Sequence, residues 1–90
     1  MRMTRQEITV ENKLGLHARP CALLVKAATK YRSDFFIEKD GMKVNGKSIM
    51  GVMMLAAEFH SKLVLIADGV DEAYLLDEIT KMFTSHFDED

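Results

Sequence analysis

The sequence contains little cysteine, little proline and no tryptophan. Its one cysteine, Cys21, cannot form an intrachain disulfide, which favours a reducing compartment such as the cytoplasm. Residues 1–7 are polar and lack the apolar run of a signal peptide. The longest apolar stretch, residues 49–57, is far too short to cross a membrane. These absences predict a cytoplasmic protein without membrane insertion.

The length and composition are those of an ordinary small globular protein. The chain has 90 residues, of which 48% are hydrophobic and 29% are charged, so we expect a single domain over 1–90 and a monomer. Such a chain buries only a modest core, so no bound cofactor is expected and any chemistry should lie on the surface. No pair of histidines has the spacing of metal ligands, and the sequence therefore predicts no metal site.

Charge is distributed unevenly along the chain. Residues 1–68 contain eleven Lys or Arg and seven Asp or Glu, a balance of +4, whereas residues 69–90 contain one Lys and seven Asp or Glu, a balance of −6. A basic surface near the start of the chain could attract an acidic protein partner. The excess of positive charge is too small to indicate a nucleic-acid-binding protein.

The apolar periodicity changes several times and predicts seven elements. Alternation indicates strands, recurrence every three to four residues indicates helices, and Asp40-Gly41 is a strong hairpin signal. Ser48 and Asp71 are placed to cap helices, and the acidic residues 85–90 are expected to fray. The predicted elements are strand 7–11, helix 18–31, strand 34–38, strand 42–45, helix 49–59, strand 63–67 and a last helix from 72 to about 84. This order predicts an α+β fold in which a four-stranded antiparallel sheet carries three helices on one face.

One short segment carries groups suited to phosphoryl chemistry. In Gly-Leu-His-Ala-Arg-Pro, residues 15–20, His17 lies where a loop meets the first turn of a helix. A neutral imidazole is a good nucleophile near neutral pH, and free N–H groups at a helix N-terminus favour a phosphate. Arg19 adds a planar cation that matches phosphate oxygens. A single histidine at a helix start is more often only a polar or capping residue, so the spacing alone leaves both interpretations open.

The same segment closely resembles the active-site signature of the HPr family, the histidine-containing phosphocarriers of the bacterial phosphotransferase system. A second segment, Asn-Gly-Lys-Ser-Ile-Met-Gly at 45–51, resembles another signature of the family. The resemblance implies an open-faced β-sandwich and a phosphocarrier that is not an enzyme in the strict sense. It implies that His17 becomes a pros-phosphohistidine by accepting a phosphoryl group from phosphorylated Enzyme I. His17 would then pass the group to enzyme IIA domains, with Arg19 steadying the phosphate.

Ser48 has a structural interpretation and a regulatory one. As a helix cap, its hydroxyl would contribute about 0.5–2 kcal/mol of stability. The resemblance implies in addition that Ser48 could be phosphorylated by HPr kinase/phosphorylase, and the added charge would then repel an acidic docking partner.

The helix after Ser48 is more apolar than the core requires. Val52, Leu55, Ala56 and Phe59 suffice for a buried face, so the remaining apolar residues either widen the core or form a docking surface. The resemblance implies docking of Enzyme I and IIA here, beside a basic rim that includes Arg19 and Lys30. The residues predicted for docking are Lys26, Lys47, Ile49, Met50 and Met53.

Two questions stay open in the sequence. The segment Asn-Lys-Leu-Gly at 12–15 and the ending Phe-Asp-Glu-Asp at 87–90 are similar to the nitrogen-related branch of the family, whereas residues 46–51 are similar to the kinase-regulated branch. The alternative function is a regulatory binding module whose phosphorylation controls partner proteins without sugar transport. Cys21, just after the first motif, is expected to serve as a small residue inside the helix.

Overall fold

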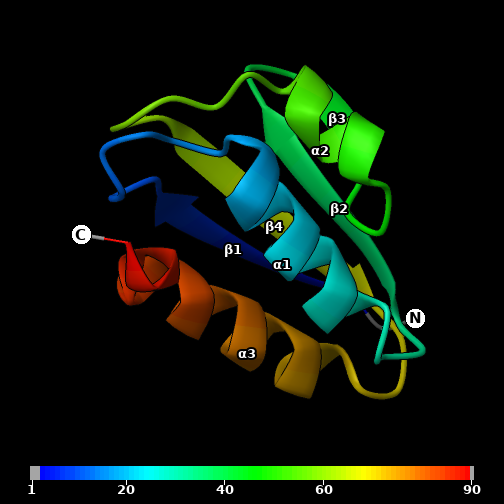
Figure 1. The fold of residues 1–90 in the computed structure, drawn as a ribbon. Coiled ribbons are helices and arrows are strands. Elements are labelled where there is room, and N and C mark those ends of the chain that lie inside the picture. Colours follow the sequence, from blue (N-terminus) through cyan, green and yellow to red (C-terminus); the bar gives the residue numbers. More distant parts are fainter. Residues whose placement is uncertain (1–2, 90) are drawn as a thin grey trace.

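The computed structural model describes residues 3–89. Figure 1 shows one sheet with the helices on the same face, which confirms the predicted α+β architecture. In the part of the chain described, no helix is both long and apolar enough to span a membrane. The elements are β1 (Thr4–Thr9), α1 (Ala18–Ala28), β2 (Asp34–Lys39), β3 (Met42–Asn45), α2 (Ile49–Met54), β4 (Lys62–Asp68), α3 (Glu72–Thr84) and a short 3-10 helix, η1 (His86–Asp88).

The sheet has the strand order β1-β4-β2-β3, and all three neighbouring pairs are antiparallel. β4 lies between β1 and β2, which explains its apolar sequence: Leu63, Leu65 and Ala67 are fully buried. The opposite face of the sheet carries charged groups. There, Arg5 of β1 pairs with Glu38 of β2 at 3.6 Å. The period-2 alternation of the strands therefore separates a covered face from an open one.

α1 and α3 lie side by side across the covered face of the sheet (Figure 1). Each turns an apolar stripe inward, as helical periodicity requires. The fully or almost fully buried side chains of α1 include Cys21 and Leu24, and those of α3 include Leu75, Ile79 and Phe83. These stripes and the covered face of the sheet together form the hydrophobic core.

The hairpin between β2 and β3 forms where the sequence predicts it. Asp40 and Gly41 have φ values of 50° and 85°, and Lys39 pairs directly with Met42. A two-residue turn with both central residues at positive φ matches the twist of the adjoining strands. Glycine and aspartate tolerate this conformation, which explains why Asp-Gly fixes the register here.

The predicted second helix is too long. The sequence predicts a helix over 49–59, whereas α2 ends at Met54. Ala56 has a φ of 49°, and the carbonyl of Ala57 accepts a hydrogen bond from the N–H of Leu16 at 2.8 Å. The chain leaves the helix to make this long-range bond. As a result Ala56 is exposed and Phe59 is 42% exposed, so the predicted buried face holds only for Val52 and Leu55.

Two other predicted boundaries differ by two or three residues. β1 covers Thr4–Thr9 instead of 7–11, because its pairing with β4 already begins at Thr4 opposite Ala67. α1 ends at Ala28 instead of 31, and the N–H groups of Lys30 and Tyr31 bond to carbonyls three residues back, in 3-10 geometry. Tertiary pairing and a tightened last turn, neither visible in the periodicity, set these ends.

Asp71 precedes α3 but does not cap it with its side chain. Its carboxylate instead accepts hydrogen bonds from the backbone N–H groups of Arg32 and Ser33, both at 2.9 Å, and from the Ser33 hydroxyl. The hydroxyl and these N–H groups lower the pKa of Asp71 to about 2. The residue therefore ties the start of α3 to the loop that follows α1.

The expectation that the tail frays is wrong for residues 85–89; residue 90 lies outside the described range. Residues 86–88 form η1, and Phe87 is 2% exposed. Its ring meets that of Phe83 edge to face, with centroids 4.9 Å apart. Burial of one aromatic ring in an otherwise acidic segment anchors the tail on the core. Figure 1 shows the end of α3 and η1 on the same side of the molecule as the loop that leads into α1.

Candidate functional site

The loop before α1 is fixed by hydrogen bonds to the segment after α2. The N–H of His60 donates to the carbonyl of Val10 at 2.8 Å, and the N–H of Leu16 donates to the carbonyl of Ala57. Gly15 between them has a φ of 69°, and a Cβ there would lie 2.5 Å from the carbonyl oxygen of Ala57. Only glycine fits this close approach, so Gly15 sets the position from which α1 begins.

His17 is the N-cap residue of α1 and has an extended backbone. Its carbonyl accepts the first helical hydrogen bond, from the N–H of Cys21 at 3.1 Å. The N–H groups of Ala18 and Arg19 lie before this first bond and have no acceptor within the helix, whereas Pro20 has no N–H group. The His17 side chain makes no capping hydrogen bond and is 35% exposed. The imidazole is thus accessible at a helix N-terminus that favours negative charge.

The partner of the imidazole is Glu89 from the tail. His17 Nε2 lies 2.7 Å from Glu89 Oε2, and the Glu89 side chain is only 13% exposed. Burial opposes ionisation of this carboxyl, but hydrogen bonds from Asn12, His17 and Arg19 outweigh it and hold the pKa of Glu89 below its usual value. The site therefore contains a carboxylate next to the candidate phosphoryl acceptor.

Arg19 reaches the same tail with both terminal nitrogens. Nη1 donates to Glu89 Oε2 at 3.0 Å and Nη2 donates to the carbonyl of Phe87 at 2.9 Å. The side chain remains 50% exposed. Since a guanidinium has five N–H donors, these two bonds leave donors for an incoming phosphate. The structure thus brings His17 and Arg19 together, as the first motif predicts.

Asn12 forms hydrogen bonds both to the loop before α1 and to the C-terminal tail. It is fully buried, and its Nδ2 donates to the carbonyl of Gly15 at 2.7 Å and to Glu89 Oε1 at 2.9 Å. Its Oδ1 is buried without a hydrogen-bond partner among residues 3–89. A buried polar side chain of this kind holds its neighbours in one arrangement.

Ser48 forms the predicted cap of α2. Its Oγ accepts from the N–H of Gly51 at 3.1 Å, and in residues 3–89 its hydrogen bonds all lie within 45–52. The structure therefore brings Ser48 into no direct bond with His17 or Arg19. Ser48 as a residue is half-buried.

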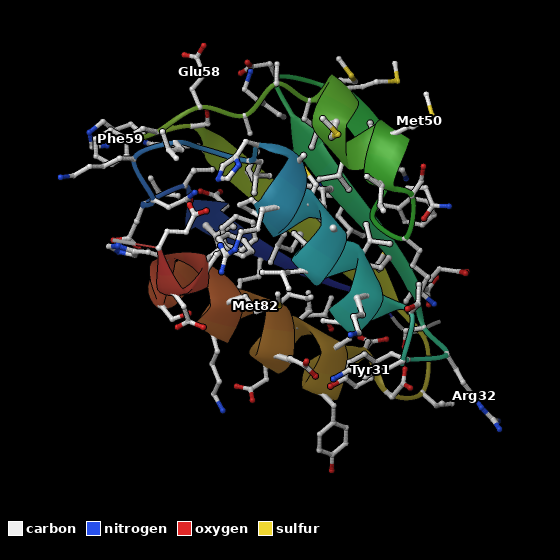
Figure 2. All side chains as sticks on the ribbon, in the orientation of Figure 1. Tyr31, Arg32, Met50, Glu58, Phe59 and Met82 are labelled. Atoms are coloured by element: carbon white, nitrogen blue, oxygen red, sulfur yellow. The ribbon has the colours of Figure 1, made fainter. Side chains whose placement is uncertain are left out.

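Apart from the buried Val52, the apolar side chains of α2 are exposed and do not widen the core. The exposed fractions are 44% for Ile49, 77% for Met50, 44% for Met53 and 67% for Met54. Figure 2 shows Met50 directed away from the molecule. Adaptable methionines on a surface are typical of protein-docking sites.

The predicted basic rim is engaged in part within the molecule. Lys47 Nζ donates to the carbonyl of Tyr31 at 2.8 Å, and Lys30 Nζ pairs with Glu78 at 2.7 Å. Lys26 is exposed and lines a shallow groove between α1 and α3 together with Met82. Figure 2 labels Met82 on the α3 side of this groove. Of the predicted docking residues, Lys26 and the apolar side chains of α2 therefore face solvent most freely.

Cys21 lies directly below the site but is chemically shielded. The side chain is fully buried, and Sγ donates to the carbonyl of Leu16 at 3.2 Å. Burial raises the pKa of the Cys21 thiol to about 11. Its expected role as a small residue inside the helix is consistent with this packing. Within residues 3–89, no cluster of His, Cys, Asp or Glu could hold a metal ion.

The sequence analysis missed the contribution of Glu89 and Asn12 to the site. The signal that could have revealed it is Phe87, a single aromatic residue inside an acidic tail. An apolar residue in such a place is the anchor by which a tail returns to the core, and it would have placed its neighbours near another element.

Comparisons with known proteins identify the family to which the chain belongs. A family model described as "PTS HPr component phosphorylation site" matches residues 4–85. The chain is 42% identical over 88 residues to phosphocarrier protein HPr of Treponema pallidum, covering 98% of this chain and 100% of that one. The solved structure of HPr-C-His from Thermoanaerobacter tengcongensis matches with a TM-score of 0.93 and 41% identity, covering 97% of this chain and 98% of that one. Crh of Bacillus subtilis, described as a catabolite repression protein and a swapped dimer, matches with a TM-score of 0.75 and 46% identity over 90% of this chain and 93% of that one.

The fold and these matches define a small phosphocarrier, a protein that carries a phosphoryl group and is not itself a catalyst. The chain belongs to the HPr family of the bacterial phosphotransferase system.

Proposed function

We propose that the protein carries a phosphoryl group on His17 in the cytoplasm. The group is received from phosphorylated Enzyme I and passed to enzyme IIA domains. The observation that supports this most is the accessible imidazole of His17 at the N-terminus of α1, 2.7 Å from Glu89 and beside the guanidinium that also contacts Glu89. The chain acts as a monomeric single domain, and Lys26, Ile49, Met50 and Met53 contribute to docking, with Lys47 at its edge.

The surroundings of His17 suit a bound phosphoryl group. A phosphate on the ring would lie near the N–H groups of Ala18 and Arg19, which the helix does not use. The positive end of the helix dipole and the guanidinium of Arg19 would stabilise its charge. The site offers positioning and charge stabilisation only, as a carrier that must also release the group requires.

The test replaces each histidine by the same residue. Asparagine is a favoured N-cap residue, suited to position 17, and tolerates positive φ, which is 76° at His60 and 55° at His86. The wild type and the three variants are mixed with phosphoenolpyruvate, magnesium and Enzyme I, and intact mass is recorded. We expect one acid-labile phosphoryl group on the wild type, His60→Asn and His86→Asn, and none on His17→Asn. Phosphorylation of His17→Asn, or its absence from the wild type while Enzyme I charges a known carrier, would contradict the proposal.

A second candidate function is regulation through Ser48, favoured by the likeness to Crh, described as a catabolite repression protein. In this case, phosphorylation of Ser48 by HPr kinase/phosphorylase would control binding to a partner, without phosphoryl transfer through His17. The two functions separate in cells that lack the natural gene. If His17→Asn restores the cellular role and Ser48→Ala does not, the regulatory function holds; the opposite pattern supports the phosphocarrier.

A further inference from the structure

The sulfur atoms of the chain divide into one shielded thiol and several exposed thioethers. The thiol of Cys21 is fully buried, burial raises its pKa to about 11, and the chain has no other cysteine. Of the seven methionines in the sequence, three belong to the six-residue helix α2: Met50, Met53 and Met54. Oxidants react fastest with exposed thiolates, and this chain presents none. Its accessible thioethers are therefore the sulfur atoms that an oxidant meets.

The most accessible thioethers lie on α2. Met50 is 77% exposed and Met54 is 67% exposed. Outside α2, Met3 and Met42 are 51% and 45% exposed, and Met82 is half-buried in the groove between α1 and α3. Figure 2 shows Met50 extending from α2 into open space. Within the described part of the chain, exposure therefore singles out two methionines four residues apart on one helix.

We infer that the methionines of α2 are a site of reversible oxidation to methionine sulfoxide, and that this modification weakens the docking of partner proteins. The inference rests on the proposed function, in which Ile49, Met50 and Met53 contribute to docking. A thioether is apolar and adapts its shape to different partners. A sulfoxide is polar, and its oxygen would have to leave water to enter an apolar interface. Oxidation therefore converts a favourable contact into an unfavourable one.

The oxidant is a peroxide, and the step is balanced with hydrogen peroxide. A lone pair of the methionine sulfur attacks one oxygen, a sulfur–oxygen bond forms and the oxygen–oxygen bond breaks. The sulfur is oxidised by two electrons, the peroxide is reduced, and the second oxygen leaves as water after it takes the proton from the first. Methionine sulfoxide reductase reverses the step with two electrons from a dithiol, which becomes a disulfide while the oxygen leaves as water.

The fold and the phosphoryl site should both tolerate the change. α2 is anchored on the core by Val52 and Leu55, which are 0% and 2% exposed, and is capped by Ser48. None of its methionines is buried. The side chains of His17 and Arg19 bond to the tail and not to α2. Oxidation should therefore act on the association with a partner and leave the transfer step itself nearly unchanged.

The experiment compares three proteins before and after treatment with dilute hydrogen peroxide, which is removed before the assay. The proteins are the wild type, the α2 variant Met50→Leu/Met53→Leu/Met54→Leu and the control Met3→Leu/Met42→Leu. Leucine has nearly the volume of methionine and no oxidisable sulfur. Peptide mass mapping locates each added oxygen. The initial rate of phosphorylation by untreated Enzyme I is recorded over a range of carrier concentrations, and each protein is compared only with its own untreated sample.

We expect Met50 and Met54 to be oxidised first, and the KM of Enzyme I for the wild-type carrier to rise about tenfold with little change in the maximal rate. The control should respond like the wild type, and the α2 variant should not respond. Methionine sulfoxide reductases acting on both epimers should restore the wild-type KM, and circular dichroism checks that the oxidised protein stays folded.

Three results would overturn this inference while the proposed function stands. They are an unchanged KM once the α2 methionines are oxidised, an equal rise in the α2 variant, and no recovery after the reductases have removed the oxygens. Absence of phosphorylation in the untreated wild type would overturn the proposed function, and this inference with it.

Discussion

The N-termini of α1 and α2 start from similar backbones but use their capping side chains differently. His17 and Ser48 both have extended backbones, and the carbonyl of each accepts the first helical hydrogen bond. Ser48 turns its hydroxyl inward and accepts from Gly51 at 3.1 Å. His17 turns its ring away from the helix to Glu89. The Ser48 side chain caps its own helix, whereas the His17 side chain leaves the N–H groups of its helix available to a ligand.

This difference shows how a helix start becomes a reactive site. A short hydroxyl side chain can reach the N–H groups of its own first turn, so it stabilises the helix and fills the space where an anion would bind. The imidazole of His17 is occupied elsewhere, by a residue 72 positions later in the sequence. The protein thus forms its reactive helix terminus through a long-range contact, and its regulatory candidate through a local one.

Replacing His17 should separate the two uses most completely. We expect His17→Asn to lose phosphorylation by Enzyme I entirely, while its free energy of unfolding changes by no more than about 1 kcal/mol, because asparagine is itself a favoured N-cap. Urea unfolding followed by circular dichroism measures the second quantity. A loss of several kcal/mol would mean that His17 is part of the folding core and would remove the contrast with Ser48.

A negative charge at Ser48 tests whether the α2 cap acts on the α1 site through docking. We expect Ser48→Asp to slow phosphorylation of His17 about tenfold at low ionic strength, because a charge in the rim of a docking surface lowers the association rate. Added salt should reduce the difference. Ser48→Asn, which has nearly the same shape and no charge, should match the wild type. Equal rates for the Asp and Asn variants would contradict a regulatory role for Ser48.

Removal of the Ser48 hydroxyl tests the structural role alone. We expect Ser48→Ala to lower the free energy of unfolding by about 1 kcal/mol, since the Gly51 N–H loses its acceptor, and to leave the phosphorylation rate of His17 unchanged. Ser85→Ala, which removes an exposed hydroxyl bonded to the Met82 carbonyl, provides the comparison and should cost less. A Ser48→Ala variant as stable as the wild type would show that the cap contributes nothing.

At the start of α3, the side chain of Asp71 bonds to the loop after α1 instead of to its own helix, and this should make the free energy of unfolding depend on pH. Asp71 has a pKa lowered to about 2, so it stabilises the fold above about pH 4 and loses this contribution as the pH falls towards 2. We expect Asp71→Asn to be less stable than the wild type at pH 6, with the difference shrinking at pH 2.5. Urea unfolding at pH 6, 4 and 2.5 measures it, and Asp77→Asn controls for the loss of one charge on α3. A difference that does not change with pH would contradict this account.

The sequence predicted the parts of the fold that depend on local patterns. Alternation and the Asp40-Gly41 turn placed the strands and the hairpin register, and the motif at 15–20 placed His17 and Arg19 together. These features are set by neighbours within a few residues, which a periodicity can represent.

The errors share one physical cause, namely contacts between distant segments. α2 ends early because Ala57 bonds to Leu16, and Asp71 leaves its helix to bind Ser33. The tail appeared to be a solvated acidic run, yet burial of Phe87 outweighs its charge and delivers Glu89 to the site. Local propensity gives no information on which distant group will accept a hydrogen bond, so the contact of His17 with Glu89 was not predictable.

The burial of Cys21 has a practical consequence for probing this carrier with its partners. A maleimide reacts with an exposed thiolate, and the sole thiol of the chain is fully buried with its pKa raised to about 11. A cysteine introduced at an exposed position outside the predicted docking surface, for example by Tyr74→Cys on α3, would therefore take a fluorophore or spin label selectively in the otherwise natural sequence. Distances to a docked partner can thus be recorded without replacing the native residue beneath the imidazole.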